Sequence, residues 1–325
     1  MRPDRPSGLD VRLRPLEAAD IPDVVALINA ADAVDGADEG AGEAEFRAWV
    51  AQPTEAGNHF VALAPSGEII GYGDVHHQAG DDGAWGWIVT HPAWRGRGVG
   101  SQIAACVREQ AQRLGVLWID YGVDIRLTQA TAWMQHLGFE PVRTYTRWRR
   151  HAATPLPPPA APPGFTIRPF APGQDDPATL DIFNISFADH RNANVAAAEA
   201  IAEGAGRPDS DPEGIFVAES AEGGIAGVCW CHINRAENTR RHARTGWIND
   251  LGVAPAFRRQ GLGRALLTTG IGWLHDQGMD AIALWMDRAN REARALYEDT
   301  GFRVDKSVTD YRHFLVGPRS PGAGA

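Results

Sequence analysis

The chain has 325 residues, of which 44% are hydrophobic, and its formal net charge is −10 at pH 7. Because single domains usually contain about 100 to 200 residues, this length predicts two domains with separate cores. The acidic balance argues against a nucleic-acid-binding protein, whose surface would carry a basic stripe, and suits cationic small substrates.

Cysteine usage and the N-terminal sequence narrow the class of protein further. The three cysteines, Cys106, Cys229 and Cys231, form neither an even set nor a paired spacing, which argues against a disulfide scaffold or a zinc ribbon. The first residues, "MRPDRPSGLD", contain no apolar run, and no window approaches about 18 consecutive apolar residues. We therefore expect a cytoplasmic protein that binds neither membranes nor nucleic acid, as a monomer or a homodimer.

The residue order predicts two similar halves joined by a linker. The stretch "HAATPLPPPAAPPGF" begins at His151 and carries six prolines in its first thirteen residues. Proline at this density favours extended polyproline structure and blocks helices and sheet ladders. We expect domains at 1–150 and 165–325, with a semi-rigid linker at 151–164.

Each half shows the same order of predicted elements. A strand and an acidic turn come first, in "VRLRPLEAAD" and "FTIRPFAPGQD". A strand, a polar turn and a second strand follow in "NHFVALAPSGEIIGYGDVHH" and "EGIFVAESAEGGIAGVCWCHI", which predicts a hairpin in each half. Another strand then leads to a glycine-rich turn and an amphipathic helix, in "AWRGRGVGSQIA" and "AFRRQGLGRALL". A final strand and helix complete each half, so a duplicated α/β domain is the simplest explanation.

The two glycine-rich turns are predicted phosphate-binding sites. Glycine lets the backbone adopt positive φ angles and approach a ligand, and the unpaired amides that open a helix attract an anion. The 163-residue separation between Gly98 and Gly261 recurs between Gly138 and Gly301, so this part of the repeat is in register. A turn that follows a strand, opens a helix and recurs in register indicates ligand binding more than a plain connection.

These turns carry a resemblance to a known family. The signature Arg or Gln, two residues, Gly, one residue, Gly or Ala is met in the second half by Arg258, Gly261 and Gly263. The preceding "LGVAP" and the later "DRANREARALYEDTGF" are similar to the fourth strand and closing segment of the GNAT acyl-CoA N-acyltransferases. Over nearly its whole length the chain resembles two GNAT domains in tandem. The resemblance implies an α/β fold in which each domain is a mixed, mostly antiparallel sheet flanked by helices.

The resemblance also implies a binding mode for acetyl-CoA, the co-substrate of the family, without a metal. In the second half the pantetheine arm would pair with the strand residues Leu251, Gly252 and Val253. The pyrophosphate would bind the turn, which consists of Arg258, Arg259, Gln260, Gly261, Leu262, Gly263 and Arg264. In the first half the corresponding residues are Ile88, Val89, Thr90, Arg95, Gly96, Arg97, Gly98, Val99, Gly100 and Ser101. Asn290 matches a family residue near the cofactor arm, and it is equally placed to cap a helix.

Acetyl transfer to an amine needs a proton donor for the departing thiolate and benefits from a general base. Tyr297 lies four residues before the closing glycine, where the family often places the tyrosine donor, although it could also simply pack against the helix face. Asp250 is the base candidate, with a structural acceptor role as the alternative. At the 163-residue offset, these positions are Met134 and Trp87 in the first half, and neither can exchange a proton. We expect a catalytic second domain and a first domain that binds acetyl-CoA without turnover or serves as a scaffold.

The acceptor is predicted only as a small-molecule primary amine. The two-domain arrangement resembles the mycothiol synthases, which acetylate a cysteinyl glucosaminyl-inositol, and in the similar stretch "SFADHRNAN" His190 is placed to meet substrate. One departure is that Trp247 stands where those enzymes carry a catalytic glutamate. Trp247 and Trp285 could wall the acceptor site or pack in the core.

Two further interpretations of the sequence bear on its chemistry. A non-catalytic acetyl-CoA sensor or docking module stays open as a different class of function. We expect His76, His77 and His232 to be structural or surface residues, because none has a carboxylate partner at ligand spacing, and hence we expect no metal site.

Overall fold

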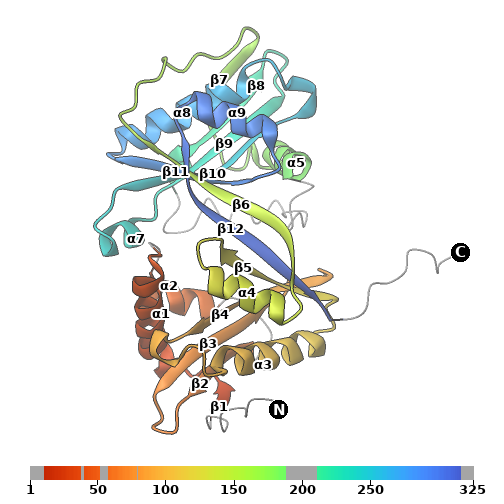
Figure 1. The fold of residues 1–325 in the computed structure, drawn as a ribbon. Coiled ribbons are helices and arrows are strands. Elements are labelled where there is room, and N and C mark those ends of the chain that lie inside the picture. The colour runs from red at the N-terminus through yellow and green to blue at the C-terminus, as the bar shows by residue number, and fades with distance from the viewer. Residues whose placement is uncertain (1–10, 38–39, 52–57, 79, 188–210, 316–325) are drawn as a thin grey trace, which may run out of the picture. The chain divides into compact units, whose positions relative to one another are not determined.

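The computed structural model describes residues 11–37, 40–51, 58–78, 80–187 and 211–315. These residues form two compact units (Figure 1). The N-terminal unit consists of the chain up to Arg143 together with the segment from Val308 onward. The C-terminal unit consists of Thr144–Ser307.

The N-terminal unit is a mixed sheet in the order β1-β2-β3-β4-β5-β12, with helices packed against it. All neighbouring strands are antiparallel except β4 and β5, which are parallel. Its elements are β1 (Arg12–Pro15), α1 (Ile21–Asp35), α2 (Glu43–Val50), β2 (His59–Leu63), β3 (Ile69–His76), β4 (Gly83–Thr90), α3 (Val99–Arg113), β5 (Trp118–Asp124), α4 (Thr128–His136) and the second part of β12 (Arg303–Phe314).

The C-terminal unit has the same architecture, with strand order β6-β11-β10-β9-β8-β7. Here the parallel pair is β10 and β11. Its elements are β6 (Glu140–His151), β7 (Phe165–Pro169), α5 (Asp176–Phe187), β8 (Ile215–Ser220), β9 (Ile225–His232), α7 (Arg235–Arg240), β10 (Thr245–Val253), α8 (Leu262–Asp276), β11 (Ala281–Asp287) and α9 (Arg291–Asp299). The expected fold, a mixed and mostly antiparallel sheet flanked by helices, is therefore confirmed in both units.

The internal repeat is visible in the element boundaries. Helix α8 begins 163 residues after α3, and β11, α9 and β12 begin 163 residues after β5, α4 and β6. The lengths of these paired elements are also equal. The register predicted from the glycines is thus confirmed from the phosphate turn to the last strand.

The last strand of each half belongs to the other half's unit. Strand β6 pairs with β11, placing Trp148 opposite Leu284. Strand β12 pairs with β5, placing Tyr311 opposite Tyr121. As a result, the compact units end within these strands and not at the proline-rich segment, which joins two strands of the C-terminal unit, β6 and β7.

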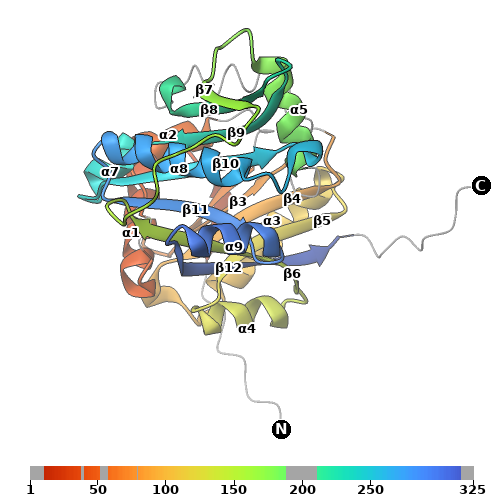
Figure 2. The same cartoon turned by 90° about the horizontal axis from the view of Figure 1, so that it is seen from above.

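The helices pack on both faces of each sheet. Ile103 of α3 lies so close to β3 that a Cβ added to Gly71 or Gly73 would meet it at 2.6 or 2.3 Å. Tyr72, between those glycines, points to the opposite face and joins the core under α1. In the C-terminal unit α8 covers β9 and β10, as Figure 2 shows. No helix in the described ranges has the length and apolar character needed to cross a membrane.

Candidate active site

The two predicted phosphate turns have nearly identical backbones. Gly261 precedes α8 with a φ of 88°, and Gly98 precedes α3 with a φ of 86°. Two residues earlier, Arg259 and Gly96 also adopt positive φ values, 64° and 71°. Because a residue with a side chain resists this conformation, Arg259 carries backbone strain that Gly96 avoids. Each turn presents the free amides of a 15-residue helix, which suits a phosphate.

In each turn an arginine side chain donates a hydrogen bond to the last carbonyl of the preceding strand. The Arg258 Nε donates to the Val253 carbonyl at 3.0 Å, and the Arg95 Nε donates to the Thr90 carbonyl at 3.2 Å. Arg95 also forms a bidentate ion pair with Asp35 at the end of α1, at 2.6 and 2.9 Å. These contacts fix the side chains of both turn arginines, and Arg95 is fixed more tightly because it also binds Asp35.

The strand before each turn separates from its parallel neighbour. Strand β10 pairs with β11 from Thr245 to Trp247 and then continues alone on that side to Val253. Strand β4 pairs with β5 from Gly83 to Trp85 and continues to Thr90 in the same way. Backbone groups at the ends of β4 and β10 are thus available for an extended ligand added beside them.

Tyr297 lies in α9, buried among the aromatic rings of the C-terminal core. Its ring centroid is 5.8 Å from that of Phe302 and 6.4 Å from that of Trp148. Burial raises its pKa above the ordinary tyrosine value, and the neighbouring Cys229 thiol and Asp250 carboxyl raise it further. Among the described residues its hydroxyl has no hydrogen-bond partner. The hydroxyl therefore stays protonated at neutral pH and is free to donate.

Asp250 faces the side of the sheet opposite α8 because β10 contains a bulge. The register to β9 shifts between Ile248 and Asp250, and Asp250 pairs with Trp230. Trp230 packs against the apolar cluster on the α5 side of the sheet. Trp247 lies on this face too, since it pairs with His232, two residues from Trp230 on β9. Because of the bulge, Trp247 and Asp250 share one face although they are three residues apart.

The surroundings of the Asp250 carboxyl raise its affinity for a proton. It is partly buried, and desolvation raises its pKa to about 6. Among the described residues it has neither a hydrogen-bond nor an ion-pair partner. At pH 7 the group is therefore mostly ionised, and its proton affinity is higher than that of an ordinary aspartate.

The N-terminal unit carries different groups at the equivalent positions. Met134 is buried in the core, and Trp87 packs beside Tyr72. The sequence interpretation missed a carboxylate on the same face: Asp74 of β3 lies opposite Trp87, and the Trp87 amide donates to Asp74 Oδ1 at 2.7 Å. The alternation Tyr72, Asp74, His76 along one strand was the available signal.

That carboxylate contradicts one expectation about the histidines. His76 was expected to have no carboxylate partner, and this is wrong, because its Nε2 lies 3.2 Å from Asp74 Oδ2. The neighbouring His77 points its Nδ1 toward the Gly83 carbonyl, at 3.3 Å.

The remaining predicted residues lie in several environments. Asn290 caps α9 by accepting a hydrogen bond from the Ala293 amide at 3.0 Å. Trp285 is 38% exposed on β11. Cys229 and Cys231 are buried core thiols, with their sulfur atoms 3.9 Å apart. His190 lies outside the described residues.

Comparison with protein families gives two matches along the chain. The family described as "Acetyltransferase (GNAT) family" matches residues 180–302. The description "Acetyltransferase (GNAT) domain" matches residues 10–140. The two matches together cover both halves of the internal repeat.

Curated relatives match nearly the whole chain. A "Mycothiol acetyltransferase" of Frankia casuarinae is 31% identical over 322 residues, covering 88% of this chain and 92% of its own. A "Mycothiol acetyltransferase" of Salinispora tropica is 32% identical over 298 residues, covering 91% of this chain and 94% of its own.

Solved structures share the fold. A GCN5-related N-acetyltransferase from Sphaerobacter thermophilus superposes with a TM-score of 0.80 at 25% identity, covering 95% of this chain and 97% of its own. A tandem GNAT protein from the clavulanic acid biosynthesis pathway superposes with a TM-score of 0.70 at 15% identity, covering 96% and 100%. The chain belongs to the GNAT family and is an acetyltransferase built from two GNAT domains in tandem.

Proposed function

We propose that the protein transfers an acetyl group from acetyl-CoA to the primary amine of a small molecule, and that the transfer occurs in the C-terminal unit. The observation that carries this proposal is that the C-terminal unit has two proton-exchanging side chains that are not engaged elsewhere. Neither Asp250 nor Tyr297 has a side-chain hydrogen-bond partner among the described residues. The N-terminal unit has Trp87 and Met134 at the matching positions.

The residues of the C-terminal unit fit the co-substrate of the family. The turn from Arg258 to Arg264 would hold the pyrophosphate on the amides that open α8. A Cβ added to Gly263 would lie in ordinary van der Waals contact with Leu296 and Val253, at 3.6 and 3.8 Å. The free edge of β10 at Leu251, Gly252 and Val253 would pair with the pantetheine arm as an added strand does.

The two side chains would then divide the proton transfers. Asp250 accepts a proton from the attacking amine, directly or through water, as the nitrogen bonds to the thioester carbon. The Tyr297 hydroxyl donates a hydrogen bond to the sulfur, which leaves as a thiolate when the carbon–sulfur bond breaks. Because burial raises the tyrosine pKa, the hydroxyl acts mainly as a hydrogen-bond donor that stabilises the leaving thiolate, and it does not lose its proton beforehand.

The N-terminal unit would bind acetyl-CoA without turnover. Its turn has the same backbone as the catalytic one, and its strand β4 offers the same free edge at Ile88, Val89 and Thr90. The Trp133 indole donates to the Ser101 hydroxyl at 3.1 Å and stiffens the first turn of α3. This unit would then stabilise the protein or report on the acetyl-CoA concentration.

A second candidate for the acceptor is the cysteinyl glucosaminyl-inositol that the mycothiol synthases acetylate. The relatives named "Mycothiol acetyltransferase" support it. Trp247 replaces the glutamate that the resemblance implies, but the bulge places Asp250 on the same face of β10 as Trp247. A carboxylate is therefore still presented to that side of the sheet, three residues further along the chain.

Mass spectrometry with labelled acetyl-CoA would test both candidates. The amine panel would contain the cysteinyl glucosaminyl-inositol, amino sugars, aminoglycosides and amino-acid derivatives. We expect one amine to gain a labelled acetyl group, and we expect Tyr297→Phe to abolish most of the product. Tight binding of acetyl-CoA without transfer to any amine of the panel or of a metabolite extract would refute the proposal and favour a sensor.

A further inference from the structure

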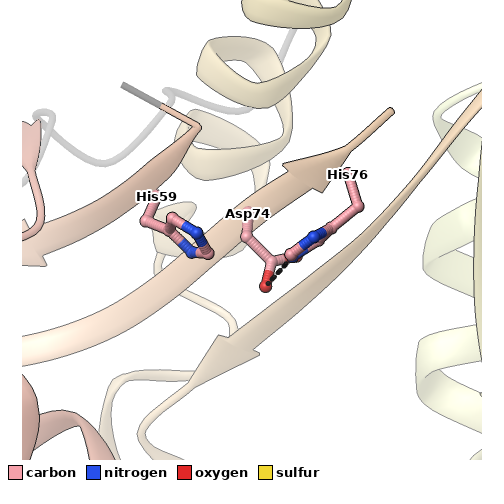
Figure 3. Close-up of side chains that lie close together, drawn as sticks. All are labelled: His59, Asp74 and His76. Atoms are coloured by element: carbon pink, nitrogen blue, oxygen red, sulfur yellow. Dashed lines mark ion pairs between the residues drawn. The ribbon is translucent and has the colours of Figure 1, made fainter. Parts of the chain in front are cut away.

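Three potential metal ligands lie together on one face of the N-terminal sheet (Figure 3). His59 of β2 pairs directly with Asp74 of β3, and His76 lies two residues further along β3. One ring nitrogen from each histidine and one Asp74 oxygen all lie within 4.8 Å of one another. All three residues are buried, and Asp74 is completely so.

A hydrogen-bond chain fixes the tautomer of His59. The Tyr72 hydroxyl donates to Asp74 Oδ2 at 2.8 Å, and the same hydroxyl lies 2.8 Å from His59 Nδ1. Because the hydroxyl proton is given to Asp74, the oxygen can only accept from His59, so Nδ1 carries the imidazole hydrogen. The Nε2 atom of His59 is left with a lone pair, buried and without a protein partner.

The second histidine also has a buried ring nitrogen without a hydrogen bond. His76 Nε2 lies 3.2 Å from Asp74 Oδ2, an ion-pair distance, but it forms no hydrogen bond among the described residues. Burying two imidazole nitrogens without hydrogen bonds is costly. Their convergence with a carboxylate indicates a ligand that accepts electron pairs from all three groups.

The surrounding residues orient the three groups as outer-shell partners do in metal sites. Asp74 accepts hydrogen bonds from the Trp87 amide at 2.7 Å and from the Trp49 indole at 3.2 Å. The His76 ring packs against two indoles, with centroid distances of 4.3 Å to Trp49 and 4.6 Å to Trp85, and the two indoles also contact each other at 5.1 Å.

We propose that His59, Asp74 and His76 bind a divalent first-row transition ion, with zinc as the best fit. Two imidazoles and one carboxylate are a zinc-type donor set, and magnesium or calcium would require oxygen ligands throughout. Bond lengths of about 2.0–2.2 Å require the ligand atoms to draw together by about 1–1.5 Å, within reach of side-chain rotation. The ion would join β2, β3 and, through Trp49, helix α2.

This site differs in kind from the catalytic pair of the C-terminal unit. His59, Asp74 and His76 lie beneath aromatic rings, and Trp85, which is 37% exposed, covers His76 from the solvent side. The three groups are buried, so they are not presented to an acceptor amine at the surface. The ion is therefore a structural element of the N-terminal unit, and acetyl transfer would not pass through it.

Cobalt titration of the full-length protein, stripped with a chelator, would test the site. We expect one Co²⁺ per chain, with visible absorption typical of low-coordinate cobalt, displacement by Zn²⁺, and a higher Tm in the presence of either ion. His59→Gln and His76→Gln should each weaken Co²⁺ binding by at least about 100-fold. Circular dichroism of the ion-free variants would establish that they fold.

The adjacent His77→Gln is the matched control. It removes one imidazole from the same segment, but that ring faces the Gly83 carbonyl, so its Co²⁺ affinity should equal that of the wild type. A folded wild-type protein that binds no stoichiometric Co²⁺ would overturn the site. Equal loss of binding in the His77 and His59 variants would overturn it as well.

Discussion

Each unit places an aspartate opposite a tryptophan on an equivalent pair of strands, but the two residues have changed strands between the units. In the C-terminal unit Asp250 of β10 lies opposite Trp230 of β9, whereas in the N-terminal unit Asp74 of β3 lies opposite Trp87 of β4. Strands β9 and β3 correspond, as do β10 and β4, so the carboxylate has moved across one strand pair without leaving its face of the sheet. Directly opposed residues have Cβ atoms about 5 Å apart, so the displacement is small.

What differs is how far each carboxylate is engaged. Asp74 accepts from a backbone amide, a tyrosine and a tryptophan, and it is fully buried. Asp250 has no such partner among the described residues, and it retains partial exposure. The comparison teaches that the same residue type can be fixed by several hydrogen bonds in one copy of the GNAT domain and stay without them in the other.

The largest expected effect is the loss of the donor in the C-terminal unit. Tyr297→Phe should lower kcat by about 10² to 10⁴, because the leaving thiolate loses its hydrogen bond. Met134→Leu, at the matching position of the N-terminal unit, should leave kcat within about twofold, since volume-conserving core exchanges are well tolerated. Steady-state thiol release measures both, and unchanged turnover in the Tyr297 variant would remove it from the mechanism.

Replacing the base should alter the pH dependence. Wild-type kcat/KM should rise with pH through about 6, as Asp250 loses its proton, and then level off. In Asp250→Asn this rise should disappear, and turnover should be low at every pH. An acidic limb that survives in the variant would show that another group is titrating.

The same substitution should stabilise the fold above neutral pH. The folded state raises the pKa of Asp250 from its ordinary value of 3.8 to about 6, so ionisation costs the folded state free energy. The wild-type stability conferred by this group is therefore present below about pH 4 and is lost as pH rises through about 6. At pH 8 Asp250→Asn should be more stable than the wild type by about 1–3 kcal/mol, with partial exposure favouring the low end. Urea unfolding at pH 4 and pH 8 would measure this difference.

The phosphate turns offer a matched pair of glycines. Gly261→Val and Gly98→Val each force a β-branched residue to a φ near 87°, at a cost of about 1–2 kcal/mol or more. Gly261→Val should raise the KM for acetyl-CoA about tenfold or more, whereas Gly98→Val should leave KM and kcat nearly unchanged. If Gly98→Val were the damaging substitution, the assignment of the active unit would be reversed.

The smallest expected effect separates Arg259 from Gly96. Arg259→Gly removes a side chain from a left-handed backbone position, which should stabilise the protein by about 0.5–1 kcal/mol after the entropy cost of glycine is subtracted. Thermal unfolding would detect a rise in Tm of a few degrees. A lower Tm would show that the Arg259 side chain contributes more than its backbone costs.

Periodicity and glycine chemistry in the sequence were sufficient to predict the repeat, both turns and the core stripes of α3 and α8. Each of these features is local, and it depends on residues close together in the chain. Tyr297 could be proposed as the donor because the family resemblance attaches that role to its position before the closing glycine, and Asp250 could be proposed as the base because it directly precedes "LGV".

Features that depend on pairing between distant strands could not be predicted. Strands β6 and β12 occupy equivalent places in the repeat, so the sequence does not say that each completes the other half's unit. The bulge at Asn249 decides which face Asp250 joins, and no residue pattern marked it. The proximity of His59 to Asp74 likewise depends on the hairpin register.

The central claim is that the chemistry occurs once per chain, and a count of transferable acetyl groups tests it most directly. The protein would be loaded with labelled acetyl-CoA until binding is saturated, then mixed rapidly with the acceptor amine and an excess of unlabelled acetyl-CoA. We expect at most one labelled acetyl group in the product per chain, even if two labelled molecules are bound. Two labelled product molecules per chain would show that both units catalyse transfer and would contradict the claim.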